Sequence, residues 1–294
     1  MPNLILWLLF SVSVFLMSDA KASFCAAEKV IEHEFSSERF TELRLNALAG
    51  DLFIEVSNND KIEVRGIACA DRESYLDRMD IDVVEDGTTL ELTVIIPYHE
   101  RDWHANYAHV DLSLKVPAHL EHLIKDSSGD LEANGINISR LNDSSGDIHL
   151  RDTTGNLSLR DSSGLVSIRS HTGNLALQDS SGDLDLVTVN GNVEVERDSS
   201  GDIEIETVSG RVFIDRDSSG DIEIDSVGQS VKVGSDGSGY IRIRDVRGSV
   251  EIGSDGSGDV TVQRVDGDFV LGRKGSGDIR TAKILGDIRI PESR

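Results

Sequence analysis

The sequence predicts an all-β protein, a parallel β-solenoid (β-helix) of about nine two-strand coils of about 19 residues each, preceded by a β-rich N-terminal cap. Three observations support this prediction. A motif, Asp-Ser-Ser-Gly-Asp, occurs five times, and its glycine recurs at steps of 17, 18, 18 and then 19 residues. A second turn, usually at a glycine, lies halfway through each period. Aliphatic pairs in strict alternation follow every turn, as expected when each repeat buries its apolar face against its neighbours.

The chain begins with an apolar segment that indicates export. Residues 1–22 are predicted to be a signal peptide, because the run from Leu4 to Met17 is too short to span a membrane and small residues suit cleavage after Ala22. A retained interfacial anchor is the alternative. A lipid anchor on Cys25 is disfavoured, since the bulky Phe24 precedes it. The mature chain is expected in the periplasm, at the cell surface or outside the cell, without a transmembrane span.

The two cysteines, Cys25 and Cys69, would both remain after cleavage. In an oxidising compartment a disulfide between them is expected, and two free, partly buried thiols are the alternative. The sequence assigns neither of them a histidine partner, so no catalytic role is predicted for them.

Residues 23–120 are expected to form the cap. Alternating patterns predict strands at 41–45, 51–56, 61–67, 80–84, 89–96 and 110–116, with a short helical turn at 74–79. A cap is needed because the open end of a parallel stack exposes backbone groups that promote self-association. Five of the eight histidines lie between His99 and His122. Their spacing matches no standard metal pattern, so an ordinary polar loop is favoured over a metal site.

Residues 121–294 are expected to form the solenoid. Each coil supplies two short strands, and the period-two alternation places all the aliphatic pairs on one face. Stacked coils therefore make two parallel sheets that face each other across a dry interior, with right-handed winding. Ile205 is expected to point inward and Glu204 outward. The pairs of the last coil, Ile279 with Thr281 and Ile288 with Ile290, are expected inside as well.

The repeated motif is predicted to form turns. The first aspartate can close an Asx-turn, the serines can bond from coil to coil, the glycine can adopt positive φ, and the second aspartate begins the strand. The stacked aspartates are expected to stay in contact with water and to attract cations loosely. The turn-forming residues of two copies are Asp198, Ser199, Ser200, Gly201 and Asp202, and Asp217, Ser218, Ser219, Gly220 and Asp221.

The outward positions of the strands are mostly charged. Glu223 and Asp225 are expected to lie beside Arg242 and Arg244 of the next coil, so that opposite charges meet between coils. On the other sheet Phe213 and Val270 face outward, which is too little for an apolar patch. The chain carries 29 basic and 53 acidic residues, a net charge of −24. Without a basic stripe, nucleic acid and anionic membranes are poor partners.

The order of these features resembles a known family. The segment from Val110 to Pro117, which closes on a polar turn and is followed by serial Ser-Gly-Asp coils, resembles the bacterial putative-adhesin family of β-strand-repeat proteins, whose function is unknown. The resemblance covers nearly the whole mature chain. It implies a β-solenoid exported to the cell envelope, and it supplies no catalytic residues.

These observations predict a non-enzymatic, exported cell-envelope protein that acts as an adhesin or as a structural or binding protein. Its ligand would be an envelope or surface protein or glycan, and no cofactor is expected. A calcium-binding β-roll-like protein is one alternative, although paired glycines and a six-residue liganding turn are missing. A carbohydrate-processing β-helix enzyme is the other, although nearly constant coil length leaves no long loops to wall a groove.

Overall fold

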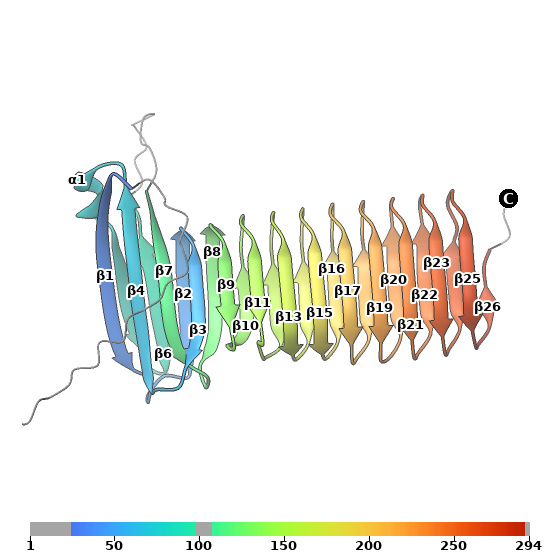
Figure 1. Ribbon diagram of the computed structural model, residues 1–294, viewed down its shortest axis with the longest axis horizontal. Helices are drawn as coiled ribbons and strands as arrows, with labels where there is room; N and C mark the ends of the chain where they lie inside the picture. The colour runs from blue at the N-terminus through green and yellow to red at the C-terminus, as the bar shows by residue number, and fades with distance from the viewer. Residues whose placement is uncertain (1–24, 98–107, 292–294) are drawn as a thin grey trace, which may run out of the picture.

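The computed structural model describes residues 25–97 and 108–291, which form a long stack of strands with the N-terminal strands at one end and the C-terminal coils at the other (Figure 1). The predicted signal peptide and the histidine-containing stretch 98–107 lie outside the described residues. Two 13-stranded sheets face each other along the whole stack. At the usual spacing between strands the stack is roughly 60 Å long.

The parallel β-solenoid is confirmed. Each coil contributes one strand to each sheet, and neighbouring strands from successive coils are parallel. The first sheet contains β9 (Leu131–Asn134), β11 (Ile148–Arg151), β13 (Val166–Thr172), β15 (Leu184–Asn190), β17 (Ile203–Val208), β19 (Ile222–Val227), β21 (Ile241–Val246), β23 (Val260–Val265) and β25 (Ile279–Ile284). The second contains β8 (Glu121–Ser128), β10 (Asn137–Asn142), β12 (Leu157–Arg160), β14 (Leu175–Gln178), β16 (Val193–Arg197), β18 (Val212–Arg216), β20 (Val231–Asp236), β22 (Val250–Asp255), β24 (Phe269–Arg273) and β26 (Ile288–Arg289).

The N-terminal strands continue the same two sheets, but in a different order from the chain. They are β1 (Ala27–Ser36), β2 (Glu42–Ala49), β3 (Leu52–Ser57), β4 (Lys61–Ala70), β5 (Asp80–Asp86), β6 (Thr89–Ile95) and β7 (Ala108–Pro117), with the single-turn helix α1 (Glu73–Leu76) between β4 and β5. Strand β3 pairs in parallel with both β7 and β9, and β2 with both β6 and β8. The coil made by β2 and β3 is therefore inserted between two later ones.

Antiparallel strands cover the N-terminal end of the stack. In one sheet β4 pairs antiparallel with β7 and β1 pairs antiparallel with β4, and in the other β5 pairs antiparallel with β6. Strands β1 and β5 form the outer edges and carry Glu and Asp at exposed positions. Charged edge strands discourage pairing with another chain, so this end is protected.

Aliphatic ladders fill the interior, as the alternation predicts. Ile205 is 1% exposed and Ile224 is 0% exposed, while Glu204 between its buried neighbours is exposed. The prediction is wrong for the last coil. Ile288 is 48% exposed and Ile290 is 37% exposed, and Ile279 and Thr281 are only half-buried. Their side chains lie at the end of the described stack, where no further described coil covers them.

From β11 to β25, each strand of the first sheet has a non-glycine residue in the left-handed region, directly after its last residue in β11 and within its last three residues in the others. These residues have φ between 51° and 62° and are Asp152, Ser170, Thr188, Thr207, Ser226, Asp245, Arg264 and Lys283. Because residue types differ at this position, no sequence pattern marked it. In the described part of the chain no helix has the length and apolar character needed to cross a bilayer.

Candidate functional site

The Asp-Ser-Ser-Gly-Asp corners join a strand of the second sheet to the next strand of the first. Asp198–Asp202 connects β16 to β17, and Asp217–Asp221 connects β18 to β19. Gly201 has φ +135° and Gly220 has φ +136°. A Cβ atom on Gly220 would lie 1.7 Å from the carbonyl oxygen of Gly201. Two features of the corner therefore require glycine at this position: the backbone conformation and the close approach of successive coils.

Serine and the second aspartate link these corners along the stack. The hydroxyl of Ser219 donates to the carbonyl of Ser199 at 3.2 Å, as expected for a ladder from coil to coil. The backbone N–H of Asp221 donates to Oδ1 of Asp202 at 2.9 Å, and the N–H of Asp202 does the same to Asp183. The second aspartates thus use one oxygen each to hold the next coil in register.

The first aspartate of the motif is buried, and this corrects the expectation that the acidic columns stay in contact with water. Asp198 is 0% exposed and Asp217 is 2% exposed. In Asp217 the carboxylate accepts a backbone N–H of its own corner, in the 3.2 Å bond from Ser219 to Oδ1, and this bond holds the side chain inward. Burial raises the pKa of Asp198 to about 7, and the neighbouring carboxylates of Asp217 and Asp179 add to the effect.

The outer face of the first sheet shows the predicted charge pairing. Arg242 lies 3.1 Å from Glu223, and Arg244 lies 2.5 Å from Glu223 and 3.0 Å from Asp225. These pairs join two adjacent coils across β19 and β21. Partly exposed ion pairs of this kind stabilise by at most about 1 kcal/mol each. They therefore contribute little to the free energy of folding, and their main effect is to favour one alignment of the adjacent strands.

The outer face of the second sheet carries a shallow hollow of about 380 Å³ around a half-buried phenylalanine. Five of its six lining side chains are polar or charged, and they come from three successive coils. The lining residues are Gln178, Glu194, Glu196, Arg197, Phe213 and Asp215. The volume lies at the lower end of the range for small-ligand sites. Sequence reasoning identified Phe213 as exposed but missed the hollow, which needs the stacking of β14, β16 and β18.

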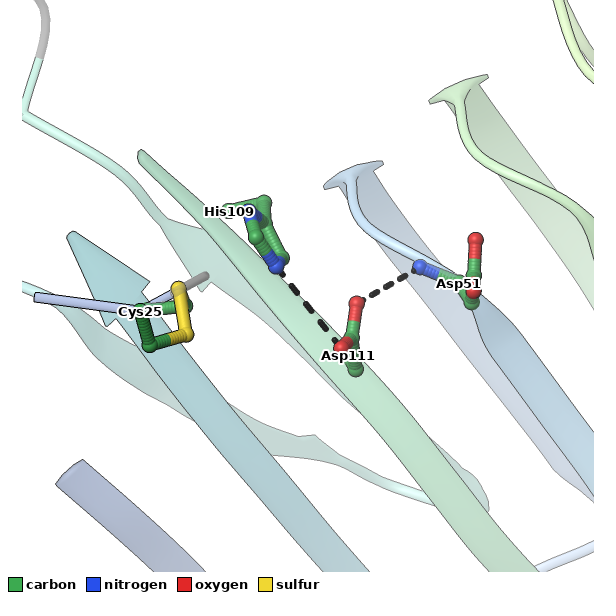
Figure 2. Close-up of a disulfide and its surroundings, with 5 residues drawn as sticks. Cys25, Asp51, His109 and Asp111 are labelled. Carbon is green, nitrogen blue, oxygen red and sulfur yellow. Dashed lines mark hydrogen bonds and ion pairs between the residues drawn. A yellow bond between two sulfur atoms is a disulfide. The ribbon is translucent and has the colours of Figure 1, made fainter. Parts of the chain in front are cut away.

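At the N-terminal end the structure joins Cys25 and Cys69 in a disulfide with a Cα–Cα distance of 5.5 Å. Figure 2 shows this disulfide beside His109, which lies directly opposite Cys69 in the pairing of β4 with β7. The Nε2 atom of His109 is 3.7 Å from Oδ2 of Asp111, whose other oxygen accepts the N–H of Asp51 at 2.9 Å. This chain of contacts ties the start of β1 to the first coils.

The sequence did not assign His109 to the cysteines, because only the strand register brings them together. Ligand atoms of Cys25, Cys69 and His109 lie within 4.8 Å of one another. Both sulfurs are used in the disulfide, so in this oxidised state they supply no thiolate to a metal ion. Of the other residues in the predicted histidine-rich region, His122 is buried, and desolvation lowers its pKa to about 4. Its Nδ1 lies 2.8 Å from the carbonyl oxygen of Asn137, which is a structural contact.

Comparison with known proteins supplies a family for this architecture. The family model described as Toastrack DUF4097 matches residues 40–271. No curated protein shows significant similarity to the chain.

Several solved structures are similar to the chain at low sequence identity. A putative cell adhesion protein from Clostridium sporogenes is 11% identical with a TM-score of 0.36, and the match covers 90% of this chain and 99% of that one. A putative adhesin from Bacteroides fragilis is 16% identical with a TM-score of 0.31, covering 89% and 96%. A putative lipid binding protein from Parabacteroides distasonis is 14% identical with a TM-score of 0.35, covering 88% and 96%.

Proposed function

Because the chain belongs to the Toastrack DUF4097 family, we propose that it is a non-enzymatic solenoid of the cell envelope, exported to the periplasm or surface, which binds a ligand as an adhesin or structural protein. The observation that carries the proposal is the unbroken stack of coils of nearly constant length. Such a stack is a stiff rod with two long outer faces, and the described coils carry no long loops that would wall a catalytic groove.

The hollow around Phe213 is the part of these faces best suited to a ligand, and we favour a glycan as that ligand. An aromatic ring offers an apolar surface to the C–H face of a sugar, while carboxylates, an amide and a guanidinium offer hydrogen bonds to its hydroxyl groups. The hollow provides this combination on a rigid sheet surface. A protein ligand that inserts an apolar side chain beside Phe213 is the competing outcome.

The calcium-binding alternative has less support. A Ca²⁺ ion takes six to eight oxygen ligands. In the repeated corners the second aspartates accept backbone N–H groups of the next coil, and the serine hydroxyls donate to carbonyls of the coil before. These serine hydroxyls and second-aspartate oxygens are therefore engaged in holding the coils together.

A glycan array with the purified mature chain tests the proposal. We expect binding to at least one glycan class, with a loss of tenfold or more for Phe213→Ala. Val270→Ala is the matched control, because Val270 lies on the same outer face three coils away, in the register that runs from Phe213 through Lys232 and Glu251. An equal loss of glycan affinity in both variants, or no loss in either, would mean that the hollow is not the binding site. Binding to no glycan, together with unchanged adhesion of cells lacking the protein, would contradict the adhesive function.

Two further measurements separate the remaining alternatives. A reducing-end assay on any bound glycan distinguishes binding from hydrolysis, and new reducing ends would overturn the non-enzymatic assignment. Cell fractionation with a surface-protease test locates the mature chain. Recovery in the cytoplasm alone would refute export.

A further inference from the structure

We propose that the buried first aspartates of successive corners form a proton-binding column, in which carboxyl groups hydrogen-bond to one another along the stack and make the solenoid more stable in mildly acidic than in alkaline solution. We refer to these residues as the aspartate column. Its members are Asp126, Asp143, Asp161, Asp179, Asp198, Asp217, Asp236 and Asp255.

The column is continuous. One aspartate comes from each of eight successive coils, and none is more than 5% exposed. Strand pairing places them in register, since Asp198 forms a parallel bridge with Asp217 and Asp236 is aligned with Asp255. Neighbouring members therefore stand one strand spacing apart, about 4.8 Å between backbones.

Every member has at least one carboxylate oxygen that is shielded from solvent and has no hydrogen-bond partner among the described groups. In Asp198 and Asp236 both oxygens are in this state. In most of the others one oxygen accepts a backbone N–H, as in the 2.7 Å bond from Ser127 to Asp126. A buried, unpaired carboxylate is strongly unfavourable and normally becomes neutral by taking up a proton.

The groups that face the column are almost all acidic. Each member faces the aspartates of the adjoining coils, and the second aspartates of the corners add further negative charge. The second aspartates that act on it are Asp51, Asp147, Asp183 and Asp202. A basic group, Lys274, acts on Asp255 at the C-terminal end. The serine N–H groups favour the charged form, but they reach only one side of each carboxylate.

Burial and these neighbours raise the pKa values of the column. Burial is the largest cause throughout, and it brings the pKa of Asp126, Asp198 and Asp236 to about 7. The pKa of Asp143 and of Asp179 rises to about 6 for the same reason. Members with a pKa of about 7 are therefore about half protonated at pH 7, and those with a pKa of about 6 take up their protons below it.

Contacts within the column fit a proton better than a metal ion. The carboxyl groups of Asp217 and Asp236, and those of Asp236 and Asp255, lie within hydrogen-bonding reach of each other. Two ionised carboxylates are both acceptors, so such a contact becomes a hydrogen bond only when one of them is protonated. A divalent cation would need several more oxygens than two adjoining corners leave unpaired.

The direction of the pH effect follows from proton linkage. The folded-state pKa of the column lies above the ordinary aspartate value of 3.8, so between about pH 4 and pH 7 the folded chain holds more protons than the unfolded chain. Stability contributed by the column is complete below about pH 4 and is lost as the pH rises through about 7. This is opposite to the usual effect of salt-bridged carboxylates.

Urea unfolding of the mature chain at pH 5.5, 7 and 8.5 tests the proposal. We expect the midpoint to fall as the pH rises. In Asp198→Asn/Asp217→Asn two of the eight members no longer titrate, and Asp198 is one of the three with a pKa of about 7, so the midpoint difference between pH 5.5 and 8.5 should shrink by about a quarter. The matched control is Glu204→Gln/Glu206→Gln, which removes two exposed carboxylates from β17, the strand that follows the Asp198 corner, and should keep the wild-type difference.

Infrared spectroscopy of the wild-type chain gives a readout that does not depend on a variant folding. We expect the carbonyl band of protonated carboxylic acid at pH 6, and its loss on titration to alkaline pH. Absence of this band at pH 6 would overturn the proposal. A midpoint that is independent of pH, or one that Ca²⁺ restores at pH 8.5 and a chelator abolishes, would overturn it too, the latter in favour of a cation column.

Discussion

Substituting Gly220 by alanine tests the close stacking of the corners most directly. The residue has φ +136°, and an added Cβ would lie 1.7 Å from the carbonyl oxygen of Gly201, whereas real Cβ contacts essentially never fall below 3.0 Å. The two coils must therefore move apart by about 1.3 Å at this corner. That movement stretches the backbone bonds from Gly201 to Ser219 and from Ile203 to Asp221, which are 3.2 and 2.8 Å long.

The cost has two parts. A non-glycine residue in this backbone region costs about 1–3 kcal/mol. Weakening two inter-coil hydrogen bonds costs about 1 kcal/mol each. Gly220→Ala should therefore lower the free energy of unfolding by about 4 kcal/mol. Gly87→Ala is the control, because Gly87 also has positive φ, +59°, but its Cβ would meet nothing within 4 Å. It should cost only about 1 kcal/mol.

Urea unfolding followed by circular dichroism measures both variants. With a slope of about 3 kcal/mol per molar urea, Gly220→Ala should shift the midpoint by on the order of 1 M and Gly87→Ala by about a quarter of that. A solenoid can lose two-state behaviour when one interface weakens, so a second, earlier transition in Gly220→Ala would also agree with the reasoning. Equal, small shifts in the two variants would refute it, because the contact between coils would then carry no cost.

Three other predictions concern the two faces of a strand, a residue with positive φ and the disulfide. Ile205→Asp buries an unpaired charge and should cost several kcal/mol, while Glu204→Lys on the outer face should change thermal stability little; the reverse order would mean that the two faces have been exchanged. Thr207→Gly removes a β-branched residue from φ +60° and should raise the free energy of unfolding by about 1 kcal/mol, and a destabilised variant would contradict the strain. Reducing the disulfide of Cys25 and Cys69 should cost about 2–4 kcal/mol and raise hydrogen exchange mainly in β1 and β4; uniform exchange changes would argue against a local role.

The repeat, its two strands per coil, the inward aliphatic ladders and the glycine corners could all be predicted from the sequence. Each of these depends on local periodicity, and in a solenoid the contacts of one coil are repeated by the next. Ile205 and Glu204 are therefore assigned to opposite faces by alternation alone, and Gly201 and Gly220 are marked as corners by their spacing.

Other features needed the stacked coils. The spacing of the motif could not show that Asp198 is buried, because its burial depends on how the corner stacks against the corners of the neighbouring coils. Nor could it bring His109 beside Cys69, since only the antiparallel pairing of β4 and β7 does so, or insert the coil of β2 and β3 between later ones. Periodicity in the sequence thus determined which side chains share a face. Contacts between coils decided which polar groups are buried away from water. Burial is what raises the pKa of the first aspartates of the corners above the ordinary value of an aspartate.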